Sequence, residues 1–115
     1  MPDANPGIKR LLIIDDDVDF VELLRTVLKP EPIDMRWCSS GEEGLEQAGK
    51  IRPDLIVLDM FMPGIHGLHA LDELRGSPAT VDTPIIIMTN MDPREVEVQA
   101  QESGADFLSK RTEIR

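Results

Sequence analysis

The sequence predicts an α/β protein with a single doubly wound parallel sheet, and two observations lead to that prediction. Five short apolar stretches alternate with segments of helical spacing or composition, which is the order expected when crossover helices join parallel strands. Two of these stretches, residues 11–14 and 55–58, are continuously apolar, as strands buried on both faces must be. The expected strands are residues 10–15, 34–38, 54–59, 84–89 and 106–109.

Length and charge restrict the classes of protein to which the chain can belong. Its 115 residues predict one domain, residues 1–115, with residues 1–8 as a polar extension before the first strand. The longest apolar runs have four residues, whereas a membrane-spanning helix needs about 20, so we expect a cytoplasmic protein without membrane contact. The net charge of −10 repels nucleic acid phosphates, so we expect no direct nucleic acid binding.

The first two helices are predicted from apolar spacing and from capping residues. The first has one apolar stripe at helical spacing, formed by Phe20, Leu23, Leu24, Val27 and Leu28. Pro30 and Pro32 stop this helix. The second begins with a capping box, in which Ser40 is followed three residues later by Glu43, and it closes near Gly49.

The later helices are less regular. The third carries Leu68, Leu71 and Leu74 and ends at Gly76. Residues 92–103 alternate in polarity as a strand does, but an N-cap aspartate followed by proline and a stop at Gly104 favour a helix. Only a few residues follow the fifth strand. We therefore expect the final helix to be missing or cut after about residue 111, in a fragment of a larger protein.

Polar side chains stand where the predicted strands end, which is the edge at which open parallel sheets bind their ligands. Asp15–Asp17 end the first strand, Asp59 the third, Thr89 the fourth, and Lys110 the fifth. Because each follows its apolar run directly, we expect all of them to meet at one edge of the sheet.

In such a cluster of carboxylates, either one carboxylate is protonated or a divalent cation lies between them. Two carboxylates about 4 Å apart repel each other by roughly 4 kcal/mol at an effective dielectric constant of 20. Oxygen ligands of this kind favour Mg²⁺, which binds one or two carboxylates together with water and phosphate oxygens. The register favours Asp15 and Asp16 as ligands, leaving Asp17 to cap the first helix. Asp59 would attack phosphorus, while the threonine and the lysine would bind phosphoryl oxygens.

The arrangement resembles the receiver domain of two-component response regulators, over the whole chain except the final helix. The acidic pair at positions 15–16 matches the family's acidic pair, and residues 59–67 resemble its acceptor loop, D-x-x-M-P-x-x-x-G. Thr89, Phe107 and Lys110 fall at its switch hydroxyl, switch aromatic and lysine positions. The resemblance implies the flavodoxin-like or CheY-like fold, with strand order 2-1-3-4-5.

The resemblance also implies a phosphorylation cycle rather than a dedicated enzyme. A sensor histidine kinase or a histidine phosphotransfer protein would supply the phosphoryl group, and the domain would catalyse its transfer to Asp59 and its later hydrolysis. Thr89 and Phe107 would then move and reshape the face of the fourth helix and fifth strand for an effector domain or output protein. The implied magnesium ligands are Asp15, Asp16, Asp59 and the backbone carbonyl of Phe61.

Two departures from the family's pattern keep an alternative open. Arg111 stands where proline is usual, and Asn90 replaces a small residue. Both support a pseudo-receiver, which has the same fold but acts as an interaction module without phosphorylation. A magnesium phosphohydrolase is disfavoured, because those enzymes generally carry a second aspartate where this chain has Phe61. Trp37 is interpreted as a strand residue without a special role, and Cys38 as a half-buried thiol without a disulfide partner.

Overall fold

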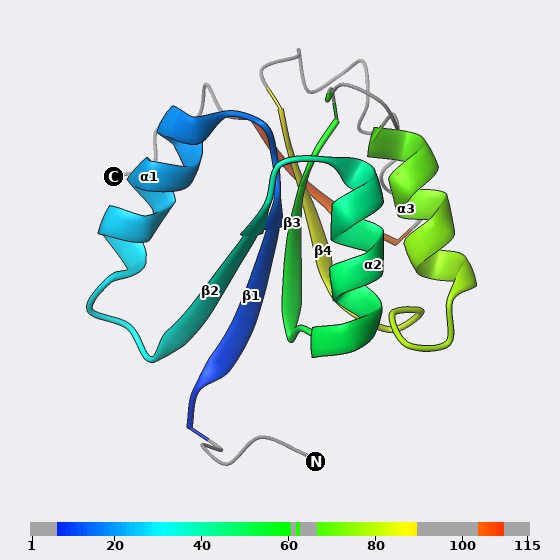
Figure 1. Cartoon of the computed structure of the whole chain (residues 1–115), viewed down its shortest axis with the longest axis horizontal. Coiled ribbons are helices and arrows are strands. Elements are labelled where there is room, and N and C mark those ends of the chain that lie inside the picture. Colours follow the sequence, from blue (N-terminus) through cyan, green and yellow to red (C-terminus); the bar gives the residue numbers. More distant parts are fainter. Residues whose placement is uncertain (1–6, 61, 63–66, 90–103, 110–115) are drawn as a thin grey trace.

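The computed structural model describes residues 7–60, 62, 67–89 and 104–109, which form three helices and five strands (Figure 1). The elements are β1 (Lys9–Ile14), α1 (Val18–Leu28), β2 (Ile33–Cys38), α2 (Gly41–Ile51), β3 (Leu55–Asp59), α3 (Gly67–Gly76), β4 (Ile85–Thr89) and β5 (Asp106–Ser109). The predicted strands are confirmed to within one residue at each end. The predicted helix over residues 92–103 and the question of a final helix fall outside the described residues. Within the described part of the chain, no helix has the length and apolar character needed to cross a membrane.

The five strands form one parallel sheet in the order β2-β1-β3-β4-β5, which confirms the predicted topology. In the register of the two central strands, Ile14 lies opposite Leu58. Asp15 follows Ile14 directly, and Asp59 follows Leu58. The sheet therefore carries these two aspartates side by side to its carboxyl edge.

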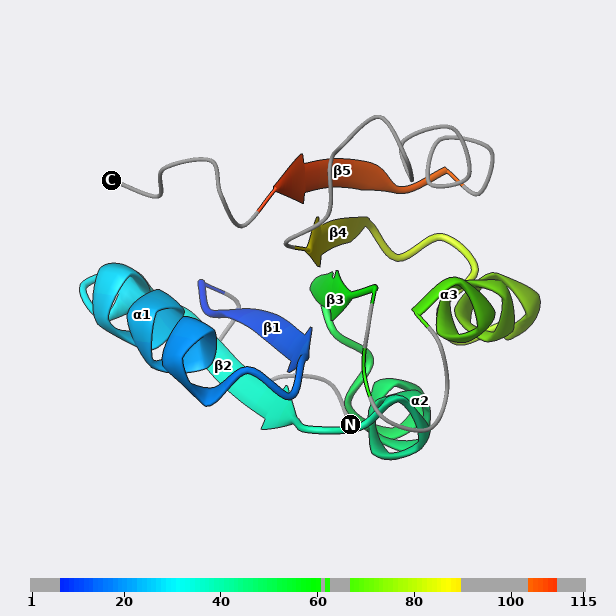
Figure 2. The ribbon, with the colours of Figure 1, turned by 90° about the horizontal axis from the view of Figure 1, so that it is seen from above.

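The helices lie on both faces of the sheet. Figure 2 shows α1 on one face and α2 with α3 on the other. Alternate strand residues point into two separate cores, which is why the central strands are apolar at every position. The core beneath α2 and α3 contains Leu12, Ile14, Ile56, Leu58, Ile85 and Ile87. The core beneath α1 contains Leu11, Ile13, Val57 and Met88.

The first helix buries part of its apolar stripe, together with Val21. The residues that it packs into the core are Phe20, Val21 and Leu24, with Leu28 partly buried. Leu23 and Val27, which belong to the apolar stripe found in the sequence, are 44% and 40% exposed. At about 100° per residue, the packed side chains fall within one arc of about 100°, and Leu23 and Val27 lie on its flank.

The capping box and the third helix agree closely with prediction. The Ser40 side chain accepts a hydrogen bond from the Glu43 backbone N–H at 3.2 Å. The Glu43 carboxylate reaches back to the Ser39 backbone N–H at 3.4 Å, one residue earlier than in the standard box. In α3, Leu71 and Leu74 are buried against the sheet.

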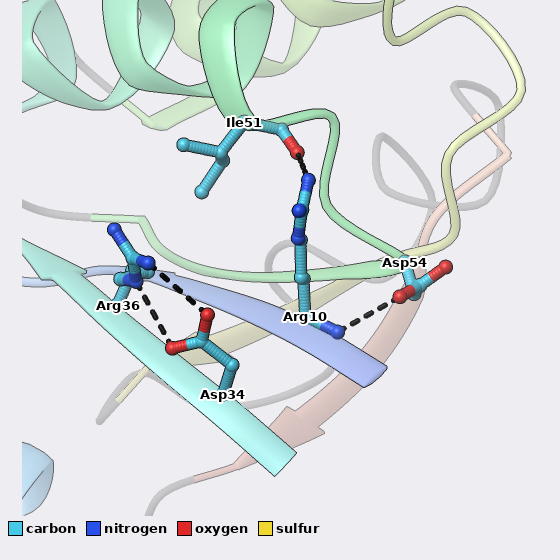
Figure 3. A network of polar contacts seen from close by, with 5 residues as sticks. All are labelled: Arg10, Asp34, Arg36, Ile51 and Asp54. Atoms are coloured by element: carbon cyan, nitrogen blue, oxygen red, sulfur yellow. Dashed lines mark hydrogen bonds and ion pairs between the residues drawn. The ribbon is translucent and has the colours of Figure 1, made fainter. Parts of the chain in front are cut away.

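The second helix ends two residues later than predicted. It continues past Gly49 to Ile51, and Arg52 then adopts a left-handed conformation with φ of 48°. The guanidinium group of Arg10 donates a hydrogen bond to the Ile51 carbonyl at 2.7 Å (Figure 3). A cation on a terminal carbonyl stabilises a helix C-terminus, so a side chain from β1 supports the end of α2.

The amino edge of the sheet is held by a reciprocal contact between β1 and the start of β3. The Arg10 backbone N–H donates to the Asp54 carboxylate at 2.8 Å (Figure 3). The Asp54 backbone N–H donates to the Arg10 carbonyl, also at 2.8 Å. On the edge strand β2, Arg36 makes two hydrogen bonds to Asp34, at 3.0 and 3.1 Å. The hydrogen bond from Arg36 lowers the pKa of Asp34. The contact between Arg10 and Asp54 favours the register that brings the aspartates together at the opposite edge.

Candidate functional site

Three carboxylates meet at the carboxyl edge of the sheet. Asp15 and Asp59 come from β1 and β3 and are almost completely buried, with exposed fractions of 0% and 5%. Asp16 is exposed. One carboxylate oxygen of each residue lies within 4.8 Å of those of the other two. The structure therefore brings together the three acidic side chains that the sequence placed at a single site.

The loop that carries Asp15 and Asp16 is held by contacts with β2 and with its own next residue. The Asp15 backbone N–H donates to the Cys38 carbonyl at 3.0 Å, and the Asp15 carbonyl accepts from the Trp37 indole N–H at 2.7 Å. The Asp17 backbone N–H donates to an Asp15 carboxylate oxygen at 2.9 Å. These contacts fix the backbone from which two of the three carboxylates project.

The third aspartate of the acidic run has a structural role. Asp17 is the N-cap of α1, and its side chain accepts a hydrogen bond from the Phe20 backbone N–H at 3.2 Å. Substituting a capping residue by alanine typically costs about 1 kcal/mol. Among the described residues, the acidic cluster consists of Asp15, Asp16 and Asp59, and Asp17 caps α1 as predicted. The metal-binding roles of Asp15 and Asp16 stay predictions.

The start of α3 packs closely against the backbone of Asp59 and Met60. The Gly67 backbone N–H donates to the Met60 carbonyl at 2.9 Å. A Cβ atom added to Gly67 would lie 2.5 Å from the Met60 Cα and 2.6 Å from the Asp59 carbonyl oxygen. Only glycine permits this contact. Met60 and Met62 are buried in the core beneath α2 and α3, and Met88 in the core beneath α1.

Cys38 is not a reactive group of the site. Burial, with a smaller contribution from the charge of Glu43, raises the pKa of the thiol to about 11. Nucleophilic and metal-binding cysteines act as thiolates, so a neutral thiol of this kind is inert.

The structure places the remaining predicted residues only in part. Thr89 is the last residue of β4 and lies opposite Ser109 of β5, and Phe107 lies opposite Ile87. The side chains of Thr89 and Phe107, and the whole of Phe61 and Lys110, fall outside the described part of the chain. Their predicted roles therefore stay predictions.

The site concentrates negative charge that a bound cation would offset. Two ionised carboxylates at the upper limit of the spacing in this cluster, 4.8 Å, would repel each other by about 3.5 kcal/mol at an effective dielectric constant of 20. One carboxylate oxygen of each of the three residues lies within the same 4.8 Å range. The three carboxylates are therefore candidate ligands of one divalent ion. An oxygen-only donor set of this kind fits a hard cation.

The chain is similar to proteins of a known family. The family model of the response regulator receiver domain matches residues 11–115. The response regulator PleD of Caulobacter vibrioides is 36% identical over 102 residues, which is 88% of this chain and 22% of PleD. The DNA-binding dual master transcriptional regulator RpaA of Synechocystis is 32% identical over 106 residues, which is 91% of this chain and 44% of RpaA. The chain thus spans less than half the length of these two relatives.

Solved structures show the same fold. A crystal structure assigned to the response regulators, from Chloroflexus aurantiacus, matches with a TM-score of 0.84 and 36% identity, covering 91% of this chain and 87% of the other. The receiver domain of the sensor histidine kinase PA1611 from Pseudomonas aeruginosa matches with a TM-score of 0.81 and 21% identity, covering 91% and 87%. That domain was solved with a magnesium ion coordinated in its active site cleft.

Proposed function

Because the chain belongs to the response regulator receiver family, we propose that it is a phosphoacceptor module whose Asp59 receives a phosphoryl group in a His-to-Asp phosphorelay. The observation that carries this proposal is the meeting of Asp15, Asp16 and Asp59 at the carboxyl edge of the sheet. The donor would be a sensor histidine kinase or a histidine phosphotransfer protein. The domain would act in the cytoplasm and pass its state to an effector domain or output protein.

The acidic cluster would hold Mg²⁺. Its ligands would be the carboxylates of Asp15, Asp16 and Asp59, with the backbone carbonyl of Phe61. The span of the three carboxylates would also suit Ca²⁺, whose bonds to oxygen are longer, at about 2.3 to 2.6 Å. The small number of protein ligands favours Mg²⁺, which keeps several waters and accepts phosphate oxygens. The magnesium ion in the PA1611 receiver domain supports this assignment. When bound, the ion would offset the charge of the carboxylates and of the phosphoryl group.

The chain's own residues would perform the transfer. A carboxylate oxygen of Asp59 attacks phosphorus, a P–O bond forms, and the P–N bond to the donor histidine breaks. The imidazole leaves with the electron pair and takes up a proton, and Asp59 becomes an acyl phosphate. Thr89 would donate a hydrogen bond to one phosphoryl oxygen, and Lys110 would neutralise another. Attack of water on phosphorus then releases inorganic phosphate and restores the carboxylate.

The phosphoryl group would act as a switch. Thr89 would move toward it and Phe107 would turn inward, which would shift the population of conformations at the fourth helix and β5. The net charge of −10 supports a module that does not itself contact nucleic acid. RpaA is named as a DNA-binding regulator, but this chain matches only 44% of its length.

The test is phosphorylation by a small-molecule donor. The purified chain is incubated with acetyl phosphate or phosphoramidate and Mg²⁺, and its intact mass is measured. We expect the gain of one phosphoryl group, which is lost in Asp59→Asn and on adding a chelator. The matched control is Asp82→Asn, an exposed position in the loop before β4, which should be phosphorylated as the wild type is. Absence of any mass gain with both donors would favour the pseudo-receiver.

A further inference from the structure

The single tryptophan of the chain bonds to the backbone of the acidic cluster. Trp37 lies near the carboxyl end of the edge strand β2, and its indole N–H donates to the Asp15 carbonyl at 2.7 Å. Its side chain is 39% exposed, so burial alone does not explain an aromatic residue at this position. The next residue, Cys38, accepts the hydrogen bond from the Asp15 backbone N–H. Two successive residues of β2 thus hold Asp15 through its N–H and its carbonyl.

The hydrogen bond from the indole also affects the backbone orientation of Asp16. The carbonyl of Asp15 and the N–H of Asp16 belong to one planar peptide unit, so fixing the carbonyl direction also fixes the plane from which Asp16 continues. Asp15 is buried and its carboxylate also accepts a hydrogen bond from the Asp17 backbone N–H. Asp16 is exposed, and its backbone direction depends on the peptide that Trp37 holds.

We propose that Trp37 is a positioning residue for the metal site, acting through the Asp15 carbonyl to orient the peptide that joins Asp15 to Asp16. This inference rests on the proposed function, because it requires that these carboxylates bind Mg²⁺. Trp37 does not touch the ion. It holds the backbone between two ligands in one orientation, so that less conformational entropy is lost when the ion binds.

The test replaces one atom of the indole. Because the chain contains one tryptophan, expression with β-(3-benzothienyl)alanine changes position 37 alone and exchanges the ring N–H for sulfur at nearly constant shape. Mg²⁺ affinity is measured by calorimetry on the modified and unmodified chains. We expect the dissociation constant to rise about threefold to tenfold, the range that the net value of one hydrogen bond predicts. Trp37→Phe, which also lacks the donor, should show the same direction.

A matched control separates this effect from loss of stability. Ile33 lies on the same strand at its other end and contributes to the core beneath α1, so Ile33→Val removes apolar volume without approaching the acidic cluster. This variant should keep the wild-type dissociation constant. The thermal unfolding midpoint of each chain is also measured with and without Mg²⁺. Because the shift is taken within one chain, it reports Mg²⁺ binding even in a destabilised variant.

The outcomes separate this inference from the proposed function. Weaker Mg²⁺ binding in the benzothienyl chain, with Ile33→Val unchanged, supports the positioning role. Equal affinities in the modified and unmodified chains overturn that role while leaving the proposed function intact. A wild-type chain that does not bind Mg²⁺ overturns both.

Discussion

Replacing Gly67 by alanine would place a methyl group against the backbone that carries the phosphoryl acceptor. The new Cβ would lie 2.5 Å from the Met60 Cα, 2.6 Å from the Asp59 carbonyl oxygen and 2.7 Å from the Met60 carbonyl oxygen. All three neighbours are backbone atoms, so no side chain can rotate to make room. Ordinary contact begins at 3.4 Å, and the start of α3 and the loop after β3 must therefore separate by about 0.9 Å.

The size of the effect follows from two opposing contributions. Overpacking of this kind costs about 1 to 3 kcal/mol. Alanine in place of glycine within a helix gains about 0.5 to 1 kcal/mol, which is smaller. We therefore expect Gly67→Ala to lower the free energy of unfolding by about 1 kcal/mol, and by no more than about 2.5 kcal/mol. A shift of the Asp59 backbone approaching 1 Å should slow phosphorylation by about tenfold to a hundredfold.

Urea unfolding and the rate of phosphorylation by acetyl phosphate measure these two effects. The matched control is Gly49→Ala, inside α2, where an added Cβ meets no atom within 4 Å. That variant should be more stable than the wild type by about 0.5 to 1 kcal/mol and should be phosphorylated at the wild-type rate. The reasoning is refuted if Gly67→Ala is as stable as the wild type and accepts phosphate as quickly.

Three further predictions concern the acidic loop, the end of α3 and the buried thiol. Asp16→Ala should weaken Mg²⁺ binding by at least about tenfold in calorimetry. Asp17→Asn keeps a capping oxygen and should bind Mg²⁺ as the wild type does. Equal losses of affinity in the two variants would contradict the division of roles. Arg75 donates to the carbonyls of Thr80, Val81, Thr83 and Gly104. Arg75→Met should therefore lower the free energy of unfolding by about 1.5 to 3 kcal/mol in urea, and a loss below that of the exposed Arg25→Met would show that these bonds are not stabilising. Cys38 has its pKa raised from 9.0 to about 11, so the folded state holds the proton more tightly than the unfolded state. The resulting stability is complete below pH 9 and is lost as the pH rises toward 11; a Cys38→Ser variant with the same pH dependence of unfolding would contradict this.

The sheet and the meeting of the carboxylates were predictable because both depend on short-range patterns. Continuous apolar runs identified the central strands, and each acidic residue follows its run directly. In a parallel sheet with Ile14 opposite Leu58, the next residues must be neighbours, so Asp15 and Asp59 follow from the register. The sequence showed a glycine at position 67, but the closeness of Met60 to it is a tertiary contact.

The features that the sequence did not show involve contacts between segments that are distant in the chain. Gly49 looked like the end of α2, but Arg10 of β1 donates to the Ile51 carbonyl and the helix continues to that residue. Leu23 and Val27 satisfied the helical spacing, yet the sheet contacts only one arc of α1 and leaves them on its flank. The role of Trp37 could not be read from its strand, because its hydrogen bond joins residues that are 22 positions apart.

The hydrogen bond from Trp37 also has an optical consequence. Indole emission responds to the polarity and hydrogen bonding around the ring, and this chain has only one indole. That ring is bonded to the residue whose carboxylate would face the ion and the phosphoryl group, and it is exposed enough to sense the solvent beside them. The unlabelled protein therefore carries its own fluorophore at the site, and every change in its emission can be assigned to a single position.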